Sequence, residues 1–424
     1  MKKYGIAIAC AACLVAGGAS AQSVEEFYKG KSMKMIIGFS AGGGYDVYAR
    51  AVGRFMEKHV PGNPNIVPQN MTGAGSRRAA NYLYNVAPKD GSIIGTLSQA
   101  VPLDQTMGEA GVKYDAIRFN WIGNSIADNN ITYVWAASGI KTMADALEKG
   151  GVVCGATGAT SPSVTFPQII NNLTTGKKFK IIRGYPGGSV INLAIERGEV
   201  NCRGSNSWSS TKSTQGDLLQ EKKIEVLVQW GAKNDPEISK FMGRDVPLIT
   251  AFATSEDDRK ALALVTAGVT IGRPIVAPPD VPADRVAALR AAFDATMKDK
   301  EFLAHASKQK MDLNPMTGQE LQDLVATVIN APPAAVNRMR QLLEQKDVSD
   351  VELKTAEGSI SAIEKRNLTI KDAAGKELGL KVHAKRTKVT IGGEKAKTDV
   401  LKVGMTCTFS YLGVNAEVAQ ARCK

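Results

Sequence analysis

Glycine and hydroxyl residues, rather than acid–base pairs, are the groups in this sequence whose spacing could do chemistry. The segment Phe39-Ser-Ala-Gly-Gly-Gly-Tyr-Asp46 follows an apolar run and precedes a helical pattern. Its glycines would let the backbone approach a ligand, and the free N–H groups of the following helix would attract an anion. A simple glycine-rich turn has the same signature. The carboxylate site predicted here comprises Ser40, Gly42, Gly43, Gly44, Tyr45 and Asp46, with Asp46 ordering the loop.

Catalysis finds little support among the polar residues. An enzyme would need a nucleophile–base pair or a paired acid and base. The three histidines are scattered at positions 59, 305 and 383, Ser161 and Ser163 have no candidate base, and no GxSxG segment occurs. No CxxC pair is present either. We therefore favour a binding protein over an enzyme, and we expect neither a cofactor nor a metal.

Alternating strand-like and helical stretches between about residues 31 and 272 must position these loops. Such alternation is typical of α/β units around largely parallel sheets. The strand-like runs include residues 36–39, 66–69, 93–98, 152–155, 181–185, 200–203, 226–230 and 269–277. The helical stretches include residues 46–59, 75–86, 143–148, 162–173 and 189–197, and further helices follow as far as residue 345. Each loop rich in glycine or serine thus lies at a strand-to-helix turn.

The beginning of the chain has the features of an export signal. Met1-Lys-Lys is a positive start, residues 6–15 are apolar, and Ala19-Ser-Ala21 is a small-residue cleavage site. We expect residues 1–21 to be a signal peptide that is cleaved after Ala21. No later apolar run has the length that a membrane-spanning helix needs.

Export changes the meaning of the cysteines. Four of the six follow the expected cleavage site, and an even number in an oxidising compartment predicts disulfides. Cys154 and Cys202 each end a strand-like run, while Cys407 and Cys423 flank the last two strand-like runs. We expect the pairs Cys154–Cys202 and Cys407–Cys423, with free buried thiols as the alternative.

The last part of the chain has a different pattern. After a polar linker at residues 346–353, residues 354–424 alternate apolar and polar residues in about six short runs, which predicts a small barrel or sandwich. From Val351 onward, eleven lysines and three arginines face eight acidic residues, leaving a net charge of +6. An oligonucleotide-binding barrel would need an aromatic platform, and only Phe409 and Tyr411 are available. We expect a structural or partner-docking domain and no nucleic-acid partner.

Residues 24–345 resemble the solute-binding proteins of tripartite tricarboxylate transporters, the TctC or Bug family. Four motifs carry the resemblance, in the family's order and spacing. The stretch from Phe39 to Arg50 is similar to F-x-x-G-G-x-x-D-x-x-A-R, and Gln69-Asn-Met-Thr-Gly-Ala-Gly75 to V-x-N-x-x-G-A-G-G. Ala87-Pro-Lys-Asp-Gly-Ser92 is similar to A-x-P-D-G-Y/H-T with an extra lysine, and Tyr185-Pro-Gly-Gly-Ser189 to the start of Y-K-G-S-G-P-A.

The resemblance implies a two-lobed α/β fold of the periplasmic-binding-protein type that closes on a carboxylate. One lobe would comprise residues 24–133 and 250–345, the other residues 134–249. The family would place this chain in the periplasm as a monomer, with membrane transporter subunits as partners. Opposite residues 40–46, the ligand would meet Thr157, Ser161, Ser163, Gly187, Gly188 and Ser189.

The other end of the ligand would meet Tyr45, Gln99, Arg203 and Trp208 in that fold, and Ser205 is a further ligand-binding candidate. An arginine fork pairs with a second carboxylate and aromatic rings offer flat walls, so a dicarboxylate or an aromatic acid would suit this set. A core position for Trp208 and a structural ion pair for Arg203 are the alternatives.

The chain departs from the family pattern near the implied ligand. Residues 155–164 lack the family's histidine, Pro186 replaces a lysine, and Arg203 stands where an apolar residue is usual. The identity of the carboxylate is therefore open. Two other functions also stay open: a carboxylate-sensing periplasmic protein that signals through its C-terminal domain to a membrane partner, and a secreted hydrolase.

Overall fold

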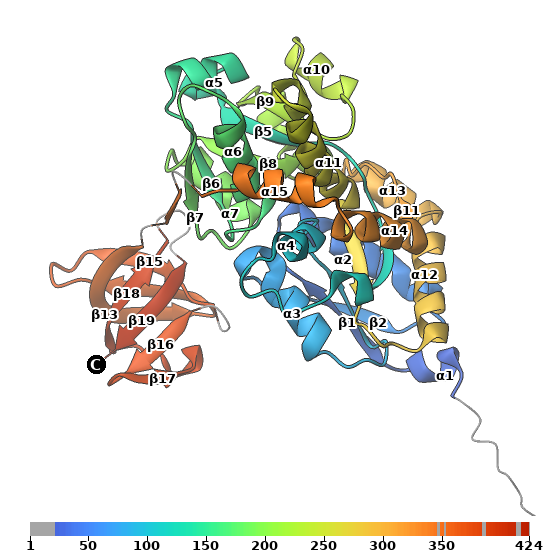
Figure 1. The fold of residues 1–424 in the computed structure, drawn as a ribbon. Coiled ribbons are helices and arrows are strands. Elements are labelled where there is room, and N and C mark those ends of the chain that lie inside the picture. Colours follow the sequence, from blue (N-terminus) through green and yellow to red (C-terminus); the bar gives the residue numbers. More distant parts are fainter. Residues whose placement is uncertain (1–21, 346–347, 352, 384–386, 413–416, 424) are drawn as a thin grey trace, which may run out of the picture.

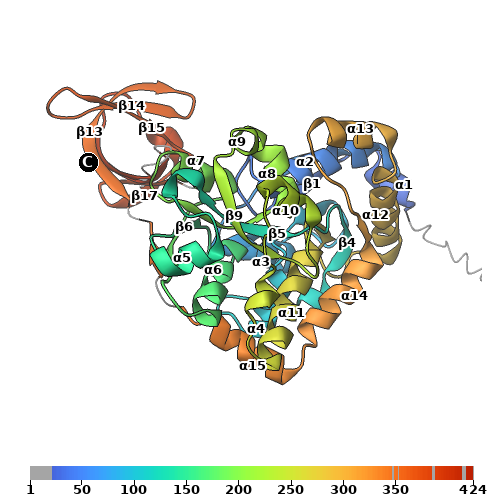
Figure 2. The same cartoon turned by 90° about the horizontal axis from the view of Figure 1, so that it is seen from above.

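The computed structural model describes residues 22–345, 348–351, 353–383, 387–412 and 417–423 (Figure 1). The expected signal peptide and its cleavage site lie outside these residues. Two α/β lobes lie against each other, and a smaller β domain lies beside them (Figures 1 and 2). None of the described helices combines the length and the apolar character that crossing a bilayer requires.

The first lobe is built around a mixed sheet with the strand order β11-β4-β10-β3-β1-β2. Strands β1, β2 and β3 are parallel, whereas β10 pairs antiparallel with β3 and β4, and β11 pairs antiparallel with β4. The strands are β1 (Ser32–Ile37), β2 (Asn65–Asn70), β3 (Ile93–Thr96), β4 (Asn120–Asn124), β10 (Pro274–Ala277) and β11 (Met316–Thr317).

Helices cover both faces of this sheet because side chains along each strand alternate between the faces. Met35 and Ile37 of β1 pack with α1 (Val24–Tyr28), α2 (Gly44–Met56), α12 (Ala283–Thr296) and α13 (Lys300–Lys308). Ile36, between them, packs with α3 (Arg77–Asn85), α4 (Val101–Met107) and α14 (Gly318–Ile329). Because β1, β2 and β3 are parallel, the loops that follow them emerge at one edge of the first lobe.

The second lobe contains a mixed sheet with the strand order β12-β7-β6-β8-β5-β9. Strands β12, β7, β6 and β8 are parallel, and β5 pairs antiparallel with β8 and β9. The strands are β5 (Asn130–Trp135), β6 (Val153–Ala156), β7 (Lys180–Arg183), β8 (Cys202–Ser207), β9 (Ile224–Trp230) and β12 (Val348–Asp350). The helices that follow them are α5 (Met143–Lys149), α6 (Pro162–Leu173), α7 (Gly188–Glu196), α8 (Trp208–Thr214), α9 (Gly216–Gln220) and α10 (Pro236–Met242).

The two lobes differ from the sequence-based expectations in four respects. Strand β5 begins at Asn130, so the chain enters the second sheet before residue 134. Helices α11 (Glu256–Ile271) and α15 (Pro333–Leu342), which were expected in the first lobe, share one apolar cluster with Phe166 and Trp230 of the second lobe and with Leu103 of α4. The expected strand 269–277 is the end of α11 followed by β10. Both sheets are mixed rather than largely parallel.

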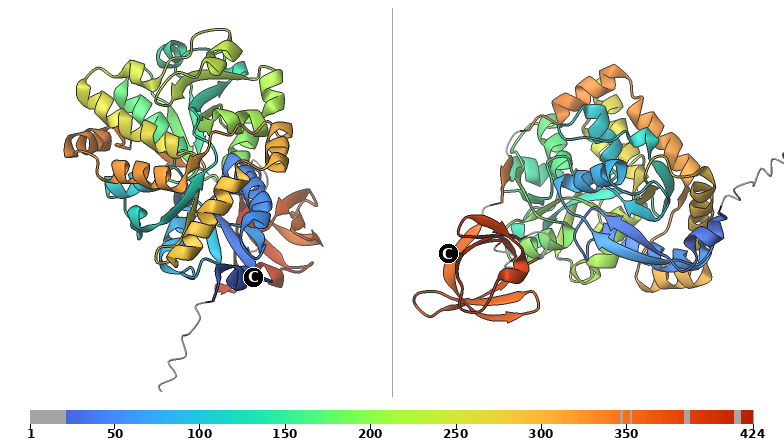
Figure 3. Two further views of the ribbon diagram at one scale, coloured as in Figure 1. Left: turned by 90° about the vertical axis from the view of Figure 1, so that its right-hand side faces the viewer. Right: turned by 90° about the horizontal axis from the view of Figure 1, so that it is seen from below.

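The C-terminal domain is a seven-stranded sheet with the order β15-β14-β13-β18-β19-β16-β17. Its strands curl into a ring around Ile360, Phe409 and Ala421 (Figure 3). The strands are β13 (Lys354–Glu364), β14 (Asn367–Lys371), β15 (Glu377–Lys381), β16 (Lys388–Ile391), β17 (Glu394–Ala396), β18 (Thr406–Tyr411) and β19 (Val418–Cys423). Strand β17 is the one that the alternation in the sequence did not predict, because it is three residues long.

The segment before this domain is part of the second lobe rather than a free linker. Within the expected linker, β12 extends the second sheet by pairing with β7, and the backbone N–H of Val351 donates to the carbonyl of Arg183 at 2.7 Å. Leu412 of the C-terminal domain is buried in the same apolar cluster as Tyr185 and Ile131 of the second lobe. The domain is therefore attached to the second lobe by a strand and by apolar packing.

Both expected disulfides are present. Cys154 and Cys202 are register partners on the parallel strands β6 and β8, with their Cα atoms 4.2 Å apart. Cys407 and Cys423 are partners on the antiparallel strands β18 and β19, 4.0 Å apart. Direct cross-strand partners bring the two Cβ atoms close enough for a disulfide.

Candidate functional site

A cavity of about 60 Å³ lies between the two lobes. A cavity needs roughly 10–15 Å³ to hold a single water, so this one can hold a few waters or a small molecule. Its lining residues come from the ends of β1, β3, β6 and β8 and from the starts of β5 and β10. They are Phe39, Gly44, Tyr45, Gln99, Asn130, Thr157, Ser161, Pro162, Ser163, Arg203, Ser205, Asn206, Ser207 and Arg273.

Eight of the residues that the sequence predicted for the site line this cavity: Gly44, Tyr45, Gln99, Thr157, Ser161, Ser163, Arg203 and Ser205. Sequence reasoning missed Phe39, Asn130, Pro162, Asn206, Ser207 and Arg273. An arginine at position 273, inside an apolar run, was the one signal that could have revealed a missed residue.

Two helix N-termini face the cavity. Helix α2 begins at Gly44, and α6 begins at Pro162, after the N-cap residue Ser161. The hydroxyls of the second loop form a cluster: the backbone N–H of Thr157 donates to Ser163 Oγ at 3.1 Å, and the Ser161 and Ser163 hydroxyls are 2.8 Å apart. Unpaired N–H groups and hydroxyls at the positive ends of two helices favour an anion.

Tyr45 forms an aromatic wall of the cavity. Its ring stacks on Phe39 with 4.5 Å between the ring centroids, and its hydroxyl accepts a hydrogen bond from the backbone N–H of Gln99 at 2.9 Å. The guanidinium of Arg273 lies 4.2 Å from the centre of the Tyr45 ring. This stacking fixes the orientation of both side chains.

Arg203 projects from β8 and is 8% exposed. Its Nε donates to the carbonyl of Ser205 at 3.0 Å, and its Nη1 donates to the carbonyl of Gly188 at 2.7 Å and to Asn192 Oδ1 at 3.0 Å. Burial lowers the pKa of Arg203, Tyr133 acts in the opposite sense, and the positive charge of Arg273 lowers it further. Arg203 therefore lines the cavity, and among the described residues it forms no structural ion pair.

The remaining predicted residues lie outside the cavity lining. Asp46 orders its loop as expected: it accepts hydrogen bonds from the N–H of Gly42 at 2.9 Å, from Arg50 Nε at 2.9 Å and from Asn70 Nδ2 at 2.7 Å. Trp208 is 2% exposed in the apolar core of the second lobe. Its position matches the alternative, a core residue, rather than a wall for the ligand.

Ser40, Gly42, Gly43, Gly187, Gly188 and Ser189 join the lobes beside the cavity. Ser189 Oγ donates to the carbonyl of Ala41 in the other lobe at 2.9 Å. A Cβ placed on Gly43 would meet the nitrogen of Gly188 at 3.7 Å. A Cβ on Gly187 would lie only 3.0 Å from Ser40 Cβ. These loops touch each other across the interface instead of touching the cavity.

At three glycines the two lobes come so close that any side chain would clash with the other lobe. A Cβ on Gly44 would lie 2.7 Å from Ser210 Cβ of the second lobe. A Cβ on Gly158 would lie 2.8 Å from Ala74 Cα of the first lobe, and Gly187 faces Ser40 in the same way. We expected the glycines to admit a ligand to the backbone. The structure shows that they admit one lobe to the other, so the two lobes are closed.

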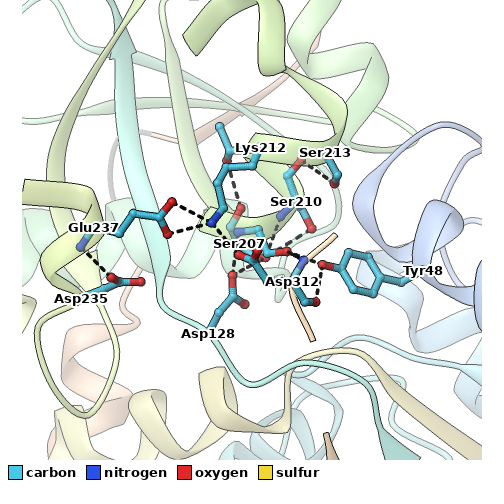
Figure 4. A network of polar contacts seen from close by, with 11 residues as sticks. Tyr48, Asp128, Ser207, Ser210, Lys212, Ser213, Asp235, Glu237 and Asp312 are labelled. Atoms are coloured by element: carbon cyan, nitrogen blue, oxygen red, sulfur yellow. Dashed lines mark hydrogen bonds and ion pairs between the residues drawn. The ribbon is translucent and has the colours of Figure 1, made fainter. Parts of the chain in front are cut away.

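Polar contacts hold the closed arrangement on two further sides. Figure 4 shows the first set: the Tyr48 hydroxyl of α2 donates to the carbonyl of Asp312 at 2.9 Å and contacts the Ser209 hydroxyl of α8. Lys212 of α8 forms ion pairs with Asp312 at 2.6 Å and with Glu237 at 2.7 Å. Helix α8 of the second lobe is thereby joined to the first lobe.

The second set joins the loop before α6 to helices α3 and α4 of the first lobe. The Thr160 hydroxyl of the second lobe donates to Asp104 Oδ2 at 2.9 Å and accepts from Arg77 Nη2 at 3.2 Å. Asp104 is 4% exposed, and burial raises its pKa to about 8, although the hydrogen bond from Thr160 and the charge of Arg77 act in the opposite direction. Asp104 is thus protonated in the folded protein below about pH 8.

The described residues contain no cluster of three or more histidine, cysteine, aspartate or glutamate side chains that could hold a metal ion. The site is instead built from hydroxyls, amides, two guanidiniums and the backbone at two helix N-termini. Such groups bind and orient a small polar molecule, and its negatively charged atoms in particular.

The chain is similar in sequence to one curated protein, although no protein-family model matches it. That protein is the UPF0065 protein in the gbd 5′ region of Cupriavidus necator. The two are 25% identical over 348 residues, which are 80% of this chain and 96% of the relative.

Solved structures share the fold more clearly than the sequence. The periplasmic binding protein BugD matches with a TM-score of 0.59 at 15% identity, over 74% of this chain and 98% of its own. Rpa4515 of R. palustris, solved with adipate, has a TM-score of 0.58 at 16% identity, over 74% and 97% of the two chains. MatC of Rhodopseudomonas palustris, with bound malate, has a TM-score of 0.55 at 17% identity, over 74% and 99%. The chain therefore has the two-lobed fold of the TctC or Bug periplasmic binding proteins, as its motifs predicted.

Proposed function

We propose that this chain is a periplasmic solute-binding protein that captures a small carboxylate-containing molecule between its lobes for a transporter of the tripartite tricarboxylate type. The observation that carries the proposal is the cavity between the lobes, lined by two helix N-termini, a hydroxyl cluster and two arginines. Each of these groups attracts a carboxylate. Each lobe supplies part of the lining, so a ligand would favour the closed arrangement.

The composition of the lining supports binding rather than catalysis. Among the residues that line the cavity, none is an acid, a histidine, a cysteine or a lysine. Ser161 and Ser163 hydrogen-bond to each other and have no base within the lining. A general base must lie within hydrogen-bond reach of the proton that it removes. The bound molecule should therefore leave the protein unchanged.

Two of the similar structures agree with a carboxylate ligand, because one was solved with adipate and the other with malate. Their sequence identity to this chain is too low to transfer either ligand. The export signal, the periplasmic location, the membrane transporter subunits and a monomeric state belong to the same proposal.

Mass spectrometry of the small molecules released from natively purified protein tests this function. We expect a carboxylic acid at up to one molecule per chain, and titration calorimetry of the stripped protein with that acid should show one site. Incubation with the acid should return it without change. A released compound lacking an acidic group, or turnover of the acid, would overturn the proposal.

A further inference from the structure

Arg203 and Arg273 bring two positive charges into one small cavity, one from each lobe. Arg203 projects from β8 of the second sheet, and Arg273 immediately precedes β10 of the first. The backbone N–H of Arg273 donates to Asn124 Oδ1 of β4 at 2.8 Å, which ties it to the first lobe. Both side chains line the cavity, and they are only 8% and 4% exposed.

Neutral groups are the hydrogen-bond partners of both guanidiniums. Arg203 donates to two carbonyls and one side-chain amide oxygen. Arg273 donates to the Ser210 hydroxyl at 2.8 Å and to the carbonyl of Gly272 at 3.4 Å, while its buried Nε has no partner. Among the described residues, neither guanidinium has a carboxylate within ion-pair distance. Burying an unpaired charge is strongly unfavourable.

One acidic residue acts on this pair from a distance. Asp128 and Arg273 attract each other without forming an ion pair, and the Asp128 carboxylate is already occupied by the Ser207 hydroxyl at 2.9 Å and the N–H of Ser209 at 2.8 Å. Arg203 and Arg273 repel each other. Closing the empty lobes thus brings two like charges together, and an incoming anion would offset their repulsion.

We propose that Arg203 and Arg273 are the specificity-determining residues of the cavity, and that they select a small dicarboxylate whose two negative charges hold the lobes closed. This inference rests on the proposed function and adds a charge requirement, namely that the ligand carries two negative charges. A guanidinium binds a carboxylate through charge-assisted hydrogen bonds, so each arginine can pair with one carboxylate. In Arg273 the Nε has no partner, and in Arg203 the Nη2 is the nitrogen outside the three hydrogen bonds given above. A monocarboxylate of the same length leaves one buried guanidinium unpaired.

Binding of acids that differ only in one charge tests the inference. The probes are the dicarboxylates from malonate to adipate, each compared by titration calorimetry with its own monoamide, which keeps the length and replaces one carboxylate by a neutral amide. We expect at least one dicarboxylate to bind at least tenfold more tightly than its monoamide. The variants Arg203→Gln and Arg273→Gln should each reduce this ratio to below threefold. Arg259→Gln is the matched control, because Arg259 is a half-exposed residue of α11 outside the cavity.

The outcomes separate this inference from the proposed function. Equal affinity of wild-type protein for a dicarboxylate and its monoamide overturns the charge requirement while leaving carboxylate binding intact. Absence of binding to all of these acids overturns the proposed function and the inference together. If either arginine variant fails to fold, the wild-type ratio still decides the charge requirement, and Arg203→Lys or Arg273→Lys, which keep the charge but not the fork, should give intermediate ratios.

Discussion

Replacing Gly44 by alanine should weaken ligand binding without weakening the fold. Gly44 is the first residue of α2, and the Cβ of an alanine there would lie 2.7 Å from Ser210 Cβ and 3.4 Å from Arg273 Nη2. Ser210 belongs to the other lobe, so the clash exists only when the lobes are closed. In the open form the new methyl group would meet solvent, and alanine is at least as favourable as glycine in a helix.

The size of the effect follows from the contact distance. Non-bonded carbon atoms keep about 3.5 Å, so the lobes would have to separate by about 0.8 Å at this point. Overpacking of this kind costs about 1–3 kcal/mol. Because the cost falls on the closed form alone, the dissociation constant should rise by about 5- to 150-fold.

Gly43 provides the matched control. A Cβ on Gly43 would meet its nearest atoms at 3.7–3.9 Å, which is ordinary contact, and the φ of −88° suits alanine. Calorimetric titration with the co-purified acid should therefore show a loss for Gly44→Ala and little change for Gly43→Ala. Thermal melting without ligand should be similar for both. An unchanged affinity of Gly44→Ala would show that the ligand does not require the closed arrangement.

Four other outcomes are expected. Asp104→Asn should raise the melting temperature near pH 8. The raised pKa of Asp104 contributes stability that is complete below about pH 4 and is lost, at about 1.4 kcal/mol per pH unit, as the pH rises to about 8. The melting temperature should therefore vary less between pH 4 and 8 in the variant than in the wild type, and an equal variation would contradict the assignment. Asp46→Asn should lower the free energy of unfolding in urea by about 1–3 kcal/mol, since Asp46 accepts three hydrogen bonds. An effect no larger than that of Arg50→Gln would count against the role of Asp46 in ordering its loop. Replacing Cys407 and Cys423 by serine should cost roughly 3 kcal/mol, measured by unfolding of the C-terminal domain, while ligand affinity stays the same. A chain ending at Asp350 should keep the wild-type ligand affinity in calorimetry. A chain ending at Gln345 also loses β12 and should melt at a lower temperature. If the chain ending at Asp350 folds but no longer binds, the C-terminal domain forms part of the site.

Local pattern was sufficient to predict much of this protein. Alternation and helical periodicity located the strands and helices around the site, because side-chain direction within an element repeats every two or 3.6 residues. Both disulfides followed from cysteines at the ends of neighbouring strands. The loops after β1 and β6 also contribute to the cavity, since the ends of parallel strands meet at one edge of a sheet.

Only the tertiary structure decided which residues of those loops face the cavity. Gly44 approaches Ser210 and Gly187 approaches Ser40, and these contacts depend on how one lobe is placed against the other. No short segment of sequence encodes that placement. Trp208 lies in the core for the same reason: an aromatic residue after a strand suits either a wall or a core, and packing against the neighbouring helices settles the choice.

Arg273 illustrates the same division. The sequence shows an arginine before an apolar strand, and local pattern cannot distinguish a solvated end from a buried charge. The fold places it over Tyr45, in the same cavity as Arg203 from the other lobe. The sequence by itself determined that loops suited to an anion exist. The tertiary structure determined that two buried arginines share one cavity. Arg203 and Arg273 are far apart in the chain, and they come close only when both cores have formed and the lobes have closed.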